Sequence, residues 1–127
     1  MKLLVDTHAF LWFMAGDSRL SRPGRRAIEA SEGDWWLSAA SVWEMAIKAS
    51  LGRLTLQASV QDYVAERIRG GLNVLSVDWP HAAAVESLPF HHRDPFDRLI
   101  AAQARSERVP IVTKDRVFAR YGIEVIW

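Results

Sequence analysis

The sequence contains no cysteine, so it can form neither a disulfide framework nor a zinc site built from thiolates. It also lacks an apolar run of the about 20 residues that a membrane-spanning helix needs, and it shows no secretory signal peptide. A glycine-rich phosphate loop, a G-x-S-x-G elbow and an H-E-x-x-H helix are missing too, which argues against an ATPase, a serine hydrolase and a zinc protease. We therefore expect a cytoplasmic protein without a membrane segment.

The chain also has no large excess of positive or negative charge, because 16 basic and 15 acidic residues leave a net charge of +1. Bulk attraction therefore does not identify a nucleic-acid partner. A local basic cluster around Arg19 and Arg22 fits a solvated face as well as it fits a phosphate contact. Half of the 127 residues are hydrophobic, and this length fits one domain, so we predict a single domain over residues 1–127.

Six tryptophans are many for a chain of this length. Trp35, Trp36 and Trp127 lie in strand-like contexts and are expected in the core. Trp12 and Trp43 lie on expected helices and are candidates to line a groove for a partner.

Short apolar runs alternate with helical segments along the whole chain. The strand-length runs are residues 2–5, 35–37, 73–77, 109–112 and 123–127. Segments with helical cues are 8–14, 21–30, 41–51, 59–69, 79–88 and 95–107. Because the apolar runs lack a clean alternation, we expect strands covered on both faces. The pattern predicts an α/β fold, with a central, mostly parallel sheet of about five strands flanked by helices.

Polar residues stand where three of these strands end, and ligands of such sheets bind beyond the carboxyl ends of the strands. Asp6 and Thr7 follow the first strand, Ser38 follows the second, and Thr113 and Asp115 follow the fourth. Each aspartate could be a helix N-cap. Two acids at one edge repel each other, however, unless a cation lies between them.

Glu44 allows two interpretations. Ser41-Val42-Trp43-Glu44 has the S-x-x-E pattern of a capping box, in which Glu44 would reach back to the Ser41 amide. Alternatively, Glu44 shares a helical stripe with Ile47 and points toward the packed side of its helix. A buried carboxylate needs a positive partner, either Lys48 one turn later or a metal ion.

The segment "HHRDPFDRLIAAQA" places two further acids at a helix start. If Asp94 caps the helix that Pro95 begins, Asp97 falls in the first turn and faces the sheet. The neighbouring His91 and His92 lack the spacing of helical metal ligands, so we interpret them as part of a solvated turn. His8 and His81 are likewise isolated.

Several carboxylates without cysteine or histidine are typical of a Mg²⁺ or Mn²⁺ site. Such an ion would activate water and stabilise charge on an attacked phosphate, which suggests hydrolysis of phosphodiester bonds. Thr7, Ser38 and Thr113 could orient the carboxylates or hydrogen-bond metal waters. Candidate phosphate contacts are Arg98, Lys48 and Arg116.

Four segments, in order and spacing, resemble the PIN-domain ribonucleases of the VapC type, which are the toxins of bacterial toxin–antitoxin pairs. They are "LLVDTHAFLWF", "SAASVWEMAIKASLGRL", "HHRDPFDRLIAAQA" and "IVTKDRVF". The resemblance implies a PIN-like three-layer sandwich and a Mg²⁺- or Mn²⁺-dependent endoribonuclease. It places the catalytic, metal-binding quartet at Asp6, Glu44, Asp97 and Asp115. Asp94, Thr7, Ser38 and Thr113 match supporting positions.

The resemblance also implies an RNA substrate, a homodimer and inhibition by a cognate antitoxin that lays an apolar segment into a groove. Two other functions remain open from the residues alone. A phosphoacceptor receiver domain would use Asp6, Asp115 and Lys114, although it predicts paired acids after the first strand. In a non-catalytic protein-binding module, every acid would be a helix cap.

Overall fold

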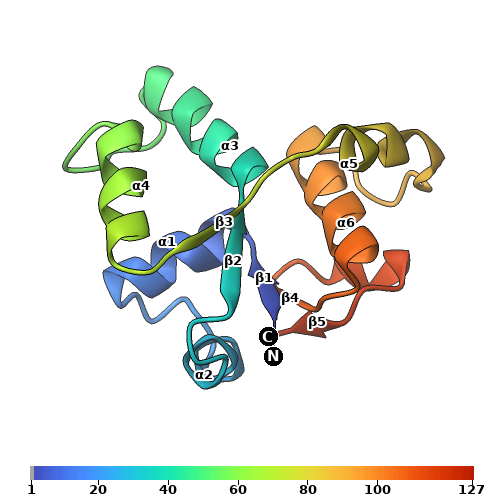
Figure 1. Ribbon diagram of the computed structural model, residues 1–127, viewed down its shortest axis with the longest axis horizontal. Helices are drawn as coiled ribbons and strands as arrows, with labels where there is room; N and C mark the ends of the chain where they lie inside the picture. Colours follow the sequence, from blue (N-terminus) through green and yellow to red (C-terminus); the bar gives the residue numbers. More distant parts are fainter. Residues whose placement is uncertain (1) are drawn as a thin grey trace.

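The computed structural model describes residues 2–127 and shows one twisted sheet between two layers of helices (Figure 1). All neighbouring strands are parallel, and their order is β3-β2-β1-β4-β5. The strands are β1 (Leu3–Val5), β2 (Trp35–Ser38), β3 (Asn73–Leu75), β4 (Ile111–Val112) and β5 (Val125–Ile126). The parallel, five-stranded sheet predicted from the sequence is confirmed.

The expected helices are present, and capping residues set their starts. Ser21, Ser59 and Asp94 accept backbone N–H groups at three of them. The helices are α1 (Thr7–Ala15), α2 (Arg22–Ala30), α3 (Ala39–Ser50), α4 (Val60–Arg69), α5 (Trp79–Ala84) and α6 (Pro95–Glu107), with 3₁₀ turns η1 (Val85–Ser87) and η2 (Arg116–Tyr121). The turn η2 was not predicted. Within residues 2–127, no helix has the length and hydropathy to cross a bilayer.

The sheet separates two apolar cores. In β1 the side chain of Leu4 packs into one core, whereas Leu3 and Val5 pack into the other. Helices α5 and α6 cover the first core, and α1, α2 and α4 cover the second (Figure 1). The apolar strands without clean alternation are therefore explained, because both faces of each central strand are buried.

The three tryptophans that were expected in the core are only partly buried. Trp35, Trp36 and Trp127 are half-buried and pack against the edges of the two cores. Trp12 packs against Trp127 with ring centroids 6.0 Å apart. Trp43 is 59% exposed.

Strand order decides where the polar strand ends meet. Strand β1 lies in the middle of the sheet, and its last residue Val5 is level with Leu37 of β2 and Val112 of β4. The residues that follow these three, namely Asp6, Ser38 and Thr113, therefore emerge side by side at one edge of the sheet. This edge faces the starts of α1, α3 and η2.

Candidate active site

Beyond this edge lies a cavity of about 240 Å³ whose lining is mostly ionisable. It brings together the four acids that the sequence singled out from separate segments of the chain. The lining residues are Asp6, Thr7, His8, Glu44, Lys48, His92, Asp94, Asp97 and Asp115. The arrangement expected from the sequence, with the acids converging in one pocket, is therefore present.

Hydrogen bonds of Thr113, the residue after β4, link Asp6 to Asp115. The Thr113 hydroxyl donates to Asp6 Oδ2 and accepts the Asp115 backbone N–H at 3.0 Å. Asp6 Oδ1 also accepts the Ala9 amide at 2.8 Å and caps α1, so Asp6 is both a helix cap and a pocket residue. Burial raises the pKa of the Asp6 carboxyl group above its usual range, although the hydrogen bonds from Thr113 and Ala9 act in the opposite direction.

Glu44 is not part of a capping box, and that interpretation is wrong. Helix α3 starts earlier than expected, with Ser38 as its N-cap, so Ser41 lies inside the helix. The Glu44 side chain is buried, accepts the Thr7 hydroxyl at Oε1 (2.8 Å), and pairs with Lys48 Nζ at Oε2 (2.6 Å). The alternative interpretation, a buried carboxylate with a positive partner, is confirmed.

Asp94 and Asp97 have different roles at the start of α6. Asp94 Oδ1 accepts the amides of Phe96 (2.8 Å) and Asp97 (3.3 Å), which makes it the N-cap. Asp97 instead points into the pocket, where burial, followed by the charge of Asp94, raises its pKa to about 7. The charges of Glu44 and Asp6 add to this rise, and only His92 opposes it.

The raised pKa of Asp97 makes the metal-free protein less stable at alkaline pH. From its ordinary value of 3.8 upward, the unfolded chain ionises this carboxyl group, whereas the folded protein keeps the proton until about pH 7. Stability is therefore lost as the pH rises through this window. We expect Asp97→Asn, which has no charge to bury, to raise the free energy of unfolding at pH 8 by up to roughly 4 kcal/mol.

Urea titrations in EDTA at pH 4, 6 and 8 test this prediction. The gain should shrink toward zero at pH 4, where Asp97 is protonated in the folded protein. Glu29→Gln, a change on the exposed side of α2, is the matched control and should be neutral at every pH. Equal stabilities of the parent and Asp97→Asn at pH 8 would contradict the assigned environment.

His92 lies in the pocket, so the interpretation of both histidines as a solvated turn is wrong for this residue. Its Nε2 is 2.6 Å from Asp115 Oδ2 and 3.1 Å from Asp97 Oδ2. His91 packs its ring on Tyr121 instead, with ring centroids 5.1 Å apart. The only clue in the sequence was that His92 stands two residues before the helix cap Asp94 and five before Asp97.

Two candidate residues point elsewhere. Ser38 caps α3 and donates to Gln103 of α6, so it joins β2 to α6 and does not line the pocket. Arg98 is 6% exposed, and its guanidinium donates to the carbonyls of Val85, Leu88 and Pro89. The expected phosphate contact of Arg98 is therefore wrong, because its donors are already used inside the fold.

The donor set fits a divalent cation. Carboxylate oxygens of Asp97 and Asp115 lie within 4.8 Å of each other and of His92 Nε2, and Asp6 and Glu44 add carboxylate oxygens to the same cavity. Carboxylate oxygens are the ligands that hard divalent ions prefer. The acidic group can therefore hold a metal ion.

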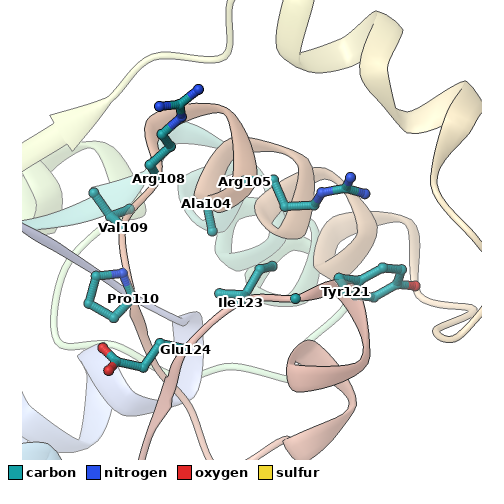
Figure 2. Close-up of a pocket in the computed structure, with 9 residues that line it drawn as sticks. Ala104, Arg105, Arg108, Val109, Pro110, Tyr121, Ile123 and Glu124 are labelled. Atoms are coloured by element: carbon teal, nitrogen blue, oxygen red, sulfur yellow. The ribbon is translucent and has the colours of Figure 1, made fainter.

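A larger cavity, of about 520 Å³, lies at the other end of the sheet. It is bordered by Val109 and Pro110, which precede β4, and by Glu124, which precedes β5 (Figure 2). The side chain of Arg108 points away from Pro110 and Glu124. Because ligands of parallel α/β sheets bind beyond the carboxyl ends of the strands, the smaller acidic pocket is the better candidate.

Comparisons with known proteins agree with this geometry. Residues 3–124 match the PIN domain family. The chain is 31% identical to Ribonuclease VapC22 of Mycobacterium tuberculosis over 115 residues, which is 90% of this chain and 87% of that protein.

Solved structures show the same fold at lower identity. DNA-bound VapBC from Salmonella typhimurium matches with a TM-score of 0.71 at 21% identity, covering 98% of this chain and 96% of that one. A toxin–antitoxin complex from Klebsiella pneumoniae matches with a TM-score of 0.61 at 18% identity, covering 91% and 88%. With its sequence match over residues 3–124 and its acids gathered at one sheet edge, the chain belongs to the PIN domain family.

Proposed function

We propose that this protein is a metal-dependent endoribonuclease, the toxin of a toxin–antitoxin pair, which hydrolyses RNA phosphodiester bonds with Mg²⁺ or Mn²⁺. The observation that carries the proposal is the convergence of Asp6, Glu44, Asp97 and Asp115 on one cavity. The similarity to a curated ribonuclease along most of both chains supports the same activity. The acids are both the catalytic and the metal-binding residues of this proposal.

The side chains around the acids set the geometry of the reaction. Thr113 orients Asp6, and Thr7 orients Glu44, because each hydroxyl donates to one carboxylate oxygen. A bound divalent ion supplies Lewis acidity and lowers the pKa of a coordinated water. One water is consumed for each P–O bond broken, and its oxygen ends on the phosphate.

Lys48 is the positive group best placed to contact the substrate. Its Nζ lies at Glu44 and it lines the same cavity, so it can pair with a phosphate oxygen when RNA enters. Arg116 is exposed at the start of η2, directly after Asp115, and remains a second candidate.

A groove for the antitoxin adjoins the acids. A cavity of about 550 Å³ shares Thr7, His8 and Lys48 with the acidic pocket and continues over apolar side chains that include Trp12. This supports Trp12 as a groove residue, whereas Trp43 contacts Phe96 and lies outside that cavity. We also propose that the protein forms a cytoplasmic homodimer, as the resemblance to VapC-type toxins implies, and the toxin–antitoxin complex among the structural relatives supports an antitoxin partner.

The two other functions fit less well. A receiver domain is not supported, because the family match runs along residues 3–124. A binding module in which every acid is a cap fits Asp6, Asp94 and Asp115, each of which caps a helix or 3₁₀ turn. It does not fit Glu44 or Asp97, whose carboxylates face the pocket.

Metal removal tests the proposed activity. We expect the purified chain to cleave RNA with Mg²⁺ or Mn²⁺ and to lose all cleavage in EDTA, because the acids repel the phosphate when no cation lies between them. Cleavage is followed by gel electrophoresis of a labelled RNA, and circular dichroism checks that EDTA leaves the fold intact. Undiminished cleavage in EDTA, or none with either ion, would overturn the proposal.

A further inference from the structure

The His92 ring is held so that its Nε2 carries a proton. Its other nitrogen, Nδ1, lies 3.1 Å from the backbone nitrogen of Asp94. A backbone N–H can only donate, so Nδ1 is the acceptor and the ring proton is on Nε2. His92 therefore presents an N–H group, and not a lone pair, to the carboxylates of Asp97 and Asp115.

The Nε2–H group of His92 lies next to carboxylate oxygens of Asp97 and Asp115 that face the pocket. Asp115 Oδ1 accepts the Val117 amide at 2.9 Å and caps η2, so Oδ2 is the oxygen that faces the pocket. His92 Nε2 contacts that oxygen at 2.6 Å and Asp97 Oδ2 at 3.1 Å. His92 is also fixed through its backbone, because its N–H donates to the Tyr121 hydroxyl at 2.8 Å.

We propose that His92 is a positioning residue that holds Asp97 and Asp115 together while no metal is bound, and that it withdraws its N–H when a divalent ion binds both. Two carboxylates repel each other, and a donor that hydrogen-bonds Asp115 and lies 3.1 Å from Asp97 Oδ2 reduces that cost. Because the N–H and a cation compete for the same two oxygens, His92 opposes metal binding. The inference rests on the proposed function, which gives these acids an ion to bind.

Calorimetric titration of the full chain with Mn²⁺ alone, without RNA, tests the competition. We expect His92→Leu to lower the Kd for Mn²⁺ about tenfold, the order expected when one charge-assisted hydrogen bond no longer has to be broken. His92→Gln keeps an N–H donor near the Nε2 position and should stay near the parent Kd. His91→Leu is the matched control, because the His91 ring packs on Tyr121 and lines no part of the acidic pocket.

A second measurement needs no substitution. In ¹⁵N-labelled protein without metal, NMR of the His92 ring should show a protonated Nε2 and an unprotonated Nδ1. Titration with Mg²⁺ should shift the Nε2–H signal of His92 and leave that of His91 in place. An Nε2–H signal that keeps its hydrogen-bonded, downfield position at saturating Mg²⁺ would contradict the inference.

The outcomes separate this inference from the proposed function. Unchanged or weaker Mn²⁺ binding by His92→Leu would overturn the inference even if the parent cleaves RNA. Tighter binding by His92→Leu in a protein that never cleaves RNA would support the inference and contradict the nuclease. Absence of Mn²⁺ binding by the parent would overturn both.

Discussion

RNA cleavage falls by roughly a thousandfold or more when Asp97 is replaced by Asn, because the site loses a charge that holds the cation and stabilises the attacked phosphate. The same variant is more stable than the parent without metal, since it removes a carboxylate whose burial is unfavourable. Loss of activity together with gain of stability is the combination expected of an acid that is kept for chemistry. Single-turnover cleavage of a labelled RNA at saturating Mg²⁺ measures the rate.

Asp94→Asn is the matched control, three residues earlier on the same helix start. Asn is as good an N-cap as Asp, so α6 keeps the hydrogen bonds that Asp94 accepts from Phe96 and Asp97. We expect this variant to lose about tenfold in rate, the lower end of the cost of changing a group beside the metal ligands. A parent-like rate for Asp97→Asn, or equal losses for the two variants, would contradict the assigned roles.

Arg98→Met lowers the free energy of unfolding by about 3 kcal/mol, because three backbone carbonyls lose their charged donor. The guanidinium lies 3.0 Å from Pro89 O, 3.1 Å from Val85 O and 3.3 Å from Leu88 O. It also packs 4.2 Å from the ring centre of Phe90. These contacts fix the segment between η1 and α6. Urea denaturation monitored by circular dichroism measures the loss.

Arg105→Met, on the exposed side of the same helix, is the control for Arg98→Met. It should change stability by less than about 0.5 kcal/mol. The activity of Arg98→Met, measured at a temperature where the variant is folded, should stay within a few fold of the parent. A large loss of activity in a fully folded variant would show that Arg98 contacts RNA after all.

The fold was accessible from the sequence because its determinants are local. Each strand is a short apolar run. Most helices begin at a serine or aspartate whose side chain accepts backbone N–H groups of the first turn. Asp6 and Asp115 could be placed at one edge of the sheet, because each follows a parallel strand. The position of β1 between β2 and β4, which makes them neighbours, is a tertiary property.

Other site residues depend on contacts that local patterns do not encode. Two adjacent histidines look alike in sequence, and it is Tyr121, from the unpredicted turn η2, that supports His92 in the pocket. Arg98 could have been assigned correctly from helix geometry, since it is rotated about 100° from Asp97 and both cannot face one pocket. Ser38 was misplaced because its partner, Gln103, comes from a distant helix.

The central position of β1 also bears on synthesis of the protein. Strand β1 leaves the ribosome long before its neighbour β4 and Asp115 do. A nascent chain that stops at residue 108 has Asp6, Glu44 and Asp97 but lacks β4, Thr113 and Asp115. A translation product that stops there would thus carry no assembled acidic pocket, because the sheet edge that forms the pocket needs β4.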